Sequence, residues 1–136
     1  MATIDTNQIT GILQRRLYDA SLGVTLALPN VAKVPDRPRL EIVHLANDRR
    51  GNTMKGSEVI REPRSLIVTV VTDIGIGLQS SEDIADSVAA LFPEGLKLAI
   101  TGGEITVTAP PQIGPGFRDE AEHRNPVTVR LESVVY

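Results

Sequence analysis

Residues 65–95, SLIVTVVTDIGIGLQSSEDIADSVAALFPEG, decide the fold because one strand, one turn and one helix follow each other directly. The run 66–71 is rich in β-branched residues and apolar on both faces, which is typical of a strand in the middle of a covered sheet. Residues 80–92 begin with a Ser-Ser-Glu-Asp cap and then repeat apolar side chains at helical spacing. Pro93 and Gly95 end the helix. The segment therefore predicts a helix packed on a sheet.

The turn in this segment reads Gly75-x-Gly77-x-x-Ser80, which matches part of a dinucleotide-binding motif. Exposed N–H groups and the positive end of a helix dipole suit a phosphate there. The third glycine of the motif is missing, however, and a hairpin follows instead of a second strand–helix–strand half. The two glycines are therefore interpreted as a sharp backbone turn before a capped helix. A small nucleotide-binding enzyme that uses Gly75–Ser80 is the less favoured alternative.

The composition is that of an ordinary globular domain. The chain has 136 residues, of which 41% are hydrophobic and 23% charged, so we expect one domain over residues 1–136. Aromatic residues make up only 3%, with no Trp, which disfavours a base-stacking surface for nucleic acid. The net charge of -3 provides no general attraction for DNA or anionic membranes.

No residue pattern predicts catalysis or a metal site. The chain has no Cys, which excludes disulfides and thiolate chemistry. His44 and His123 show no metal-ligand spacing, and we expect His44 to be packed or hydrogen-bonded. Glu82, Asp83 and Asp86 lie where a helix dipole favours negative charge. We therefore expect no enzyme and no cofactor, and, since neither an apolar run of about 18 residues nor a signal-peptide pattern is present, no membrane association.

The remaining segments predict a second helix and further strands. Residues 5–22 carry an apolar stripe that predicts an amphipathic helix, with Gly23 as its cap. Residues 58–61 are typical of a weak strand, which Pro63 separates from the strand 66–71. The predicted order is helix, three strands, helix, three strands, which indicates a two-layer α+β domain with a mostly antiparallel or mixed sheet and both helices on one face. The other strands are expected at 40–45, 96–100, 104–108 and 127–135, with a tight hairpin at Gly102-Gly103.

Two predicted loops, 47–56 and 110–126, are longer than the roughly 4–6 residues that are usual in compact domains. Both are rich in charged side chains. They can be interpreted as solvated, flexible segments, or as loops that become ordered against partner subunits. In the second interpretation, the candidate contacts at an assembly interface or a lumen are Arg49, Arg50, Lys55, Arg61, Arg118, Asp119, Glu120 and Arg124.

Taken together, these features resemble the tail terminator proteins of long-tailed bacteriophages and related gene transfer agents, which are also called tail completion or minor tail proteins. The most distinctive shared part is the helix that ends Leu91-Phe92-Pro93-x-Gly95. The resemblance covers nearly the whole chain. Its other parts are a leading helix, a Pro-rich connection into the strand at 38–42, the block 66–71, the Gly75-Ile-Gly77 turn, a Gly-Gly hairpin, a Pro/Gly loop and a closing strand.

The resemblance implies a structural virion protein without catalytic residues. Such a subunit forms a hexameric ring that caps the tail tube, stops its polymerisation and offers a docking surface to the head connector. The implied partners are copies of itself, the tail tube protein and a head-completion or connector protein, with DNA only as cargo passing through the lumen. The implied location is the neck-proximal end of the virion tail, and the host cytoplasm during assembly. Another head–tail connector or a tail tube subunit is the alternative within the same class.

Overall fold

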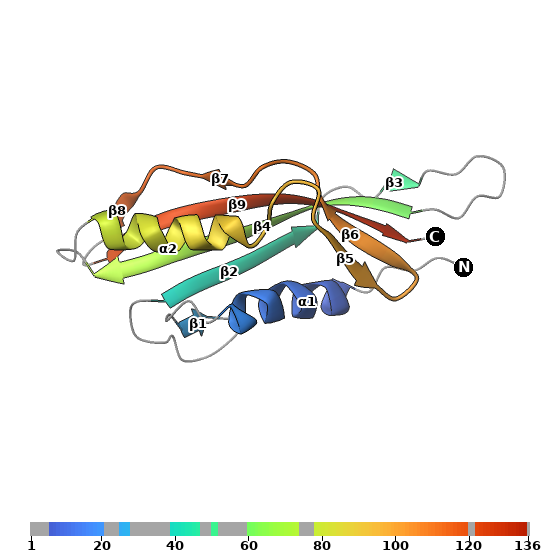
Figure 1. Ribbon diagram of the computed structural model, residues 1–136, viewed down its shortest axis with the longest axis horizontal. Coiled ribbons are helices and arrows are strands. Elements are labelled where there is room, and N and C mark those ends of the chain that lie inside the picture. Colours follow the sequence, from blue (N-terminus) through green and yellow to red (C-terminus); the bar gives the residue numbers. More distant parts are fainter. Residues whose placement is uncertain are drawn as a thin grey trace.

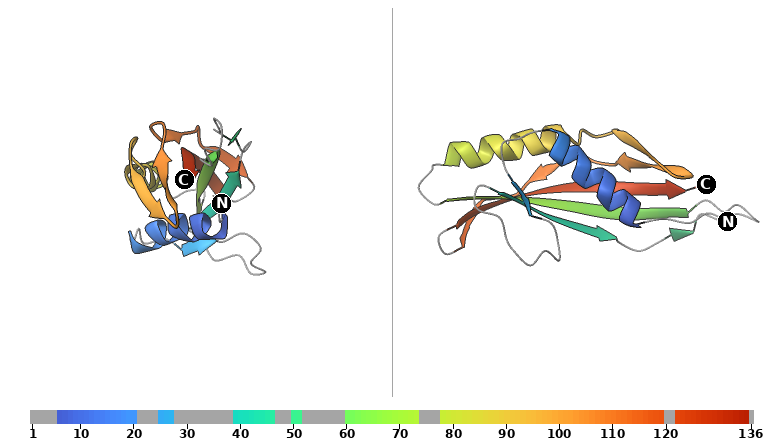
Figure 2. Two further views of the ribbon diagram at one scale, coloured as in Figure 1. Left: turned by 90° about the vertical axis from the view of Figure 1, so that its right-hand side faces the viewer. Right: turned by 90° about the horizontal axis from the view of Figure 1, so that it is seen from below.

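Two helices lie on one face of a long, twisted sheet, as the views in Figures 1 and 2 show. The computed structural model describes residues 6–20, 25–27, 39–46, 50–51, 60–73, 78–119 and 122–135. The helices are α1 (Thr6–Asp19) and α2 (Leu78–Ala90). The strands are β1 (Thr25–Ala27), β2 (Arg39–Ala46), β3 (Arg50–Gly51), β4 (Ile60–Asp73), β5 (Lys97–Ile100), β6 (Gly103–Val107), β7 (Gln112–Ile113), β8 (Phe117–Asp119) and β9 (Glu122–Val135).

The centre of the sheet is the antiparallel pair of β4 and β9. The pair runs from Ile60 opposite Val135 to Asp73 opposite Glu122 without a bulge. The strand order is β1-β2-β4-β9-β6-β5, with β3 beside β4 and with β7 and β8 beside β9. Only β1 and β2 pair in parallel among these strands. The predicted two-layer α+β class is confirmed, and the short strands β1, β3, β7 and β8 accompany the longer ones that were predicted.

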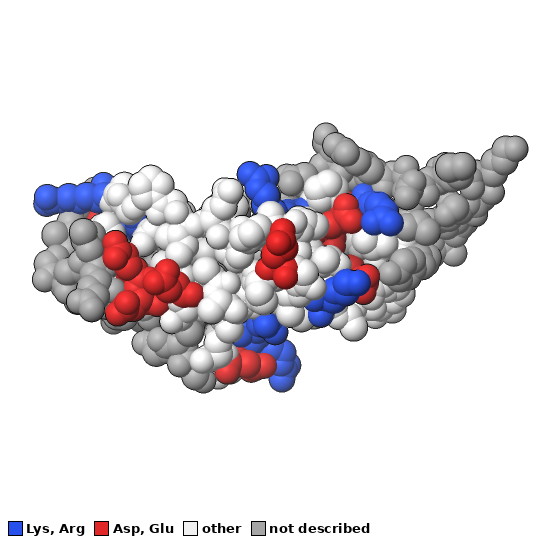
Figure 3. Space-filling model, turned by 45° about the horizontal axis from the view of Figure 1, so that its top comes forward, with Lys and Arg blue, Asp and Glu red and all other residues white. Residues whose placement is uncertain are grey.

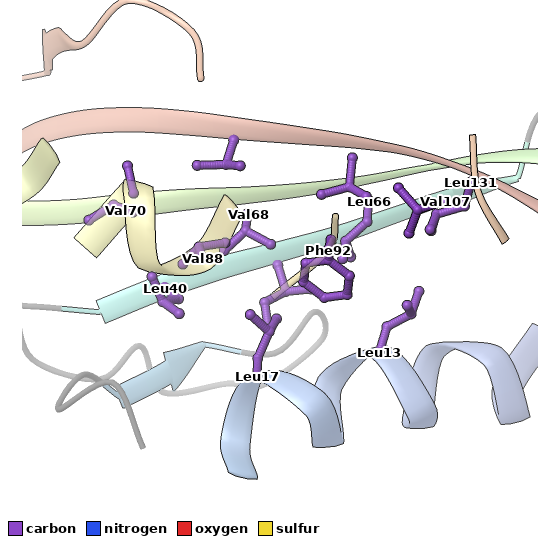
Figure 4. Close-up of a cluster of buried hydrophobic side chains, with 14 of the residues drawn as sticks. Leu13, Leu17, Leu40, Leu66, Val68, Val70, Val88, Phe92, Val107 and Leu131 are labelled. Carbon is purple, nitrogen blue, oxygen red and sulfur yellow. The ribbon is translucent and has the colours of Figure 1, made fainter. Parts of the chain in front are cut away.

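The core lies between the helices and the inner face of the sheet, which is the face that the helices cover (Figure 4). The stripe of Ile9, Leu13 and Leu17 on α1 is fully buried, as its helical spacing predicts. Even-numbered residues of β4 and odd-numbered residues of β9 supply the other side, because side chains alternate along a strand. Each fully buried Leu or Val contributes roughly 1.5–3 kcal/mol. Other buried members are Leu40, Leu66, Val68, Val70, Ala85, Val88, Phe92, Ile105, Val107, Val127, Val129 and Leu131.

The last strand is longer than predicted and contains a proline. β9 begins at Glu122 instead of residue 127, and the predicted loop 110–126 is wrong in part because β7 and β8 also lie within it. The carbonyl of Pro126 accepts a hydrogen bond of 2.8 Å from the Gly114 N–H. An antiparallel residue directs its N–H and C=O toward the same neighbour. The nitrogen of Pro126 therefore faces the short strand β7, where one hydrogen bond is missing. On the other side, the pairing of β9 with β4 loses no hydrogen bond.

The predicted break at Pro63 is wrong, since β4 passes through it without interruption. Even-numbered residues of β9 bond toward β6 and β7, so odd-numbered residues of β9 bond to even-numbered residues of β4. The backbone of Pro63 consequently faces the other side, toward β2 and β3. There β2 ends opposite Arg64 and β3 begins opposite Arg61, so among the described strands no partner faces Pro63. A proline at such a gap costs no ladder hydrogen bond.

Each helix differs from the prediction at one end, whereas the hairpin is as predicted. α2 begins at Leu78, so Ser81 is not a cap but a fully buried member of the core-facing stripe. The turn at residues 74–77 lies outside the described residues. The helix α1 ends at Asp19, earlier than predicted, and its predicted cap, Gly23, also lies outside the described residues. In the confirmed hairpin, Gly102 has a φ of 75°, which favours glycine. Gly103 is needed for another reason, since a Cβ there would lie 1.8 Å from the carbonyl oxygen of Val134.

Candidate assembly surfaces

The candidate contact residues fall into three groups. Arg49, Lys55 and Glu120 lie outside the described residues. Arg50 pairs through its backbone with Arg61 on β4. The others lie on β8 and β9, namely Arg118, Asp119 and Arg124.

Arg124 belongs to an ionic network on the outer face of the sheet, the face that the helices leave uncovered. Its guanidinium contacts Glu41 and Glu122 at 3.0 Å each, and Asp119 at 3.5 Å. Arg39 contacts the same two glutamates, at 3.0 Å for Glu41 and 2.7 Å for Glu122. The five side chains meet at one end of the sheet because odd-numbered residues of β2 and even-numbered residues of β9 share the outer face. The network thereby joins β2, β8 and β9.

Burial and pairing set the electrostatics of this outer network. The Arg39 side chain is only 8% exposed, so its charge depends on its carboxylate partners. Burial by itself would raise the pKa of Glu122, but the hydrogen bonds from Arg39 and Arg124 outweigh it and lower the pKa. The hydrogen bond to Glu41 is the main cause that raises the pKa of Arg124. These groups therefore stay charged and clamp strands whose residues are 83 positions apart in the chain.

The sequence pattern identified two members of this network but missed the other three. Arg39 and Glu41 are two residues apart on one strand, as are Glu122 and Arg124, so each pair shares a face. This spacing of two residues was the signal in the sequence that could have revealed each pair. The sequence does not show that β2 and β9 lie on either side of β4, which brings the two pairs together at the end of the sheet that holds Arg39 and Glu122. The structure accounts for Arg124 and Asp119 by contacts within the chain, and a contact of either residue with another subunit stays a prediction.

The remaining described candidates are exposed. Arg61 pairs with Glu132 at 3.1 Å at the opposite end of the outer face, and its side chain is 45% exposed. Arg118 is exposed on β8. Between the two ends lie Val43 and Leu45 of β2, which are 45% and 46% exposed. The outer face therefore has ion pairs at both ends and apolar side chains in the middle.

A second arginine cluster lies on the inner face. Arg64 is fully buried, forms an ion pair with Glu62, and donates to Ser133 Oγ at 3.0 Å and to His44 Nε2 at 3.2 Å. Because arginine only donates, His44 Nε2 accepts, and Nδ1 carries the proton that it donates to Thr10 Oγ1 at 2.8 Å. Burial, helped by the charge of Arg64, lowers the pKa of His44, while Glu62 opposes the shift. The prediction that His44 is packed or hydrogen-bonded is confirmed.

Neither arginine cluster is arranged for chemistry. Within the described ranges, no group of three or more His, Asp and Glu side chains could hold a metal ion. No helix in that part of the chain is long and apolar enough to cross a membrane. The carboxylates of both clusters are held by arginines, so their geometry is that of structural clamps.

Comparisons with known proteins agree with this description. Residues 8–131 match a family model described as phage tail terminator protein. No protein of curated function matches significantly. A solved structure superposes with a TM-score of 0.77 at 23% sequence identity, over 98% of both chains. That likeness shows a shared fold.

Proposed function

This chain belongs to the phage tail terminator family, and on that premise we propose that it forms a ring, hexameric as its sequence resemblance implies, that caps the tail tube. In this proposal the ring stops tube polymerisation and then offers its free side to the head connector. The partners are other copies of the chain, the tube protein and a connector or head-completion protein. DNA passes through the lumen, and the ring lies at the neck-proximal end of the tail.

The family is structural and not enzymatic, and it places the chain in the virion tail, in association with the tail tube. The enzyme interpretation of Gly75–Ser80 therefore has no support. A protein of this class acts through its surfaces, so the exposed faces of the fold are where function is to be sought.

The observation that carries the proposal is the family match over almost the whole chain, joined to a sheet with one face that the helices leave uncovered. Val43 and Leu45 on that face are nearly half exposed, and Phe117 of β8 is 51% exposed. Apolar side chains between rims of ion pairs are typical of surfaces that bind other proteins. In the proposal, the basic residues of the 47–56 segment contact a ring neighbour or line the lumen.

The test is polymerisation of the cognate tail tube with and without the purified chain, followed by negative-stain electron microscopy. We expect shorter tubes that carry one additional ring at a single end. Tubes of unchanged length without a terminal ring would contradict the proposal. Long tubes formed by the chain alone would identify it as a tube subunit, and binding to the connector without binding to tube ends would identify it as a connector component.

A matched variant tests the basic segment. Replacing Arg49, Arg50 and Lys55 with Ala is expected to impair capping or DNA passage while the melting temperature of the monomer stays close to wild type. The segment is expected to contact partners and not the core, because its charged side chains lie outside every apolar stripe. A large fall in melting temperature with unchanged capping would contradict this assignment.

A further inference from the structure

The outward surface of α1 carries a defined stripe of side chains. Asn7, Gly11, Arg15 and Tyr18 are spaced by four, four and three residues, so they share the side of the helix opposite the core. All four are exposed. Tyr18 is 73% exposed, and the side chain of Arg15 is 82% exposed. We call these four residues the α1 stripe.

Gly11 has no role that its surroundings in the described part of the chain explain. Glycine in the middle of a helix lowers stability relative to alanine. A Cβ added at Gly11 would meet nothing within 4 Å, so neither a close approach inside the chain nor a positive φ requires this residue. A helix surface without a side chain does, however, let another backbone approach closely. Gly11 therefore leaves room for the backbone of another molecule to pack on this part of α1.

Tyr18 and Arg15 have the chemistry of interface anchors. Tyrosine and arginine are enriched among the residues that dominate binding energy in protein interfaces. Among the residues that the structure describes, Arg15 has only a weak partner, since its Nε lies 3.8 Å from Asp19 and both side chains are largely exposed. Its positive charge is thus available to a carboxylate of another molecule.

The outward surface of α2 has the complementary charge. Glu82, Asp83 and Asp86 are exposed, α2 contains no Lys or Arg, and none of the three carboxylates forms an ion pair with another described residue. Ala90, on the same side of the helix, is small and exposed. Acidic side chains gather at the end of the molecule where α2 begins (Figure 3). The two helices point their outer sides in different directions (Figure 2), so one molecule can present both surfaces at once.

We propose that the α1 stripe docks against the acidic side of α2 in a second copy of this chain. The charges are complementary, and the contact joins two different surfaces, so it repeats head-to-tail and can close into a ring. This inference rests on the proposed function, because it names the contact between neighbours in that ring.

The main test is charge reversal followed by rescue, with self-association of the full chain measured by sedimentation velocity over a range of concentrations. Arg15→Glu alone, and Glu82→Lys with Asp83→Lys and Asp86→Lys together, are each expected to weaken association by about tenfold or more. Combining all four substitutions is expected to restore most of it. The control is Lys97→Glu, the same charge change at an exposed position on β5, away from both helix surfaces, which is expected to have no effect.

Gly11→Ala gives a test with opposite signs. We expect a melting temperature that rises by about 3–5 °C, because alanine favours the helix, together with weaker association, because the new methyl group blocks the close approach. Tyr18→Ala is expected to weaken association without changing the melting temperature. A Gly11→Ala variant that is more stable and associates as well as wild type would overturn the close approach.

Mixing variants tests the head-to-tail geometry. The Arg15→Glu variant keeps an intact α2, and the triple α2 variant keeps an intact α1 stripe. In an equimolar mixture every contact between unlike variants joins complementary charges, either the original pair or the reversed pair. The mixture is therefore expected to form assemblies larger than a dimer in which the two variants alternate, although neither variant associates well alone. Dimers and nothing larger would overturn the head-to-tail geometry. Rings that survive either reversal would overturn the contact while leaving tube capping intact. A wild-type chain that stays monomeric at every concentration would also overturn it, whereas loss of capping by a chain that still forms rings would count against the proposed function alone.

Discussion

Two arginine clusters lie on opposite faces of the same sheet, and they differ in how much water reaches them. On the inner face, Arg64 and its ion-pair partner Glu62 are completely enclosed. On the outer face, Arg39 is nearly buried, whereas the carboxylates around it remain 20–30% exposed. A buried charge that loses its partner cannot be rescued by solvent, but a partly exposed one can. The same chemistry should therefore be far more sensitive to substitution on the inner face.

The largest effect is expected for Arg64→Met. This change leaves Glu62 buried without its counter-charge, and we expect a loss of about 3–5 kcal/mol in the free energy of unfolding. Urea denaturation measures it. Adding Glu62→Gln should recover part of the loss, because the uncompensated charge is then gone. A single variant within about 1 kcal/mol of wild type would contradict the contrast between the faces.

A smaller loss is expected for Arg39→Ala on the outer face. Glu41 and Glu122 lose one partner but keep Arg124, and both are partly hydrated. We expect a loss of about 1–3 kcal/mol in the same urea experiment. Arg39→Lys should recover only part of it, since an ammonium group lacks the planar fork that contacts both carboxylates. A loss as large as that of Arg64→Met would show that the outer network is as desolvated as the inner one.

The pH dependence of the free energy of unfolding distinguishes the contributions of the two clusters in the wild-type chain. The pKa of His44 lies below its ordinary value of 6.5 in the folded state, so the unfolded chain takes up the proton first. The stability due to neutral His44 is present above about pH 6.5 and is lost as the pH falls below it. The lowered pKa of Glu122 gives stability that is present above 4.5 and is lost only as the pH falls below that value.

We therefore expect two acid-induced losses, the inner cluster first and the outer network second, in thermal melts recorded across this range. His44→Gln should remove the first step and retain the second. A first step that persists in this variant would show that another group causes it.

The smallest effect is expected for Asp119→Asn. Asp119 is 58% exposed and lies 3.5 Å from Arg124, so its pairing is weak and open to screening by salt. We expect a change of less than about 1 kcal/mol in the free energy of unfolding. A loss above about 2 kcal/mol would contradict this expectation and would mean that the pairing of β8 with β9 is stabilised mainly by the Asp119–Arg124 contact.

Local patterns predicted the parts of the fold that local physics controls. The stripe of Ile9, Leu13 and Leu17 and the β-branched run in β4 follow from side-chain periodicity, which needs only neighbouring residues. The stop after α2 follows from Pro93 and from Gly95, whose φ is 88°. Composition needs no structure at all: the absence of Cys excludes disulfides and thiolate chemistry, and the low aromatic content disfavours a base-stacking surface for nucleic acid.

Strand pairing, in contrast, was decided only by the tertiary structure, because whether a backbone N–H finds an acceptor depends on which strand lies beside it. Proline rules predicted a break at Pro63 and a loop up to Pro126. In the structure the nitrogen of each proline, which has no hydrogen to donate, faces either a gap between strands or the short strand β7, so the central β4–β9 ladder loses no hydrogen bond. The partners of Arg64 and Arg124 were hidden for the same reason, since they come from strands far apart in the chain. The sequence by itself determined the two helices and the apolar central runs of the long strands, because side-chain periodicity is local. The register between strands, which is non-local, determined where the short strands pair and what each polar residue meets.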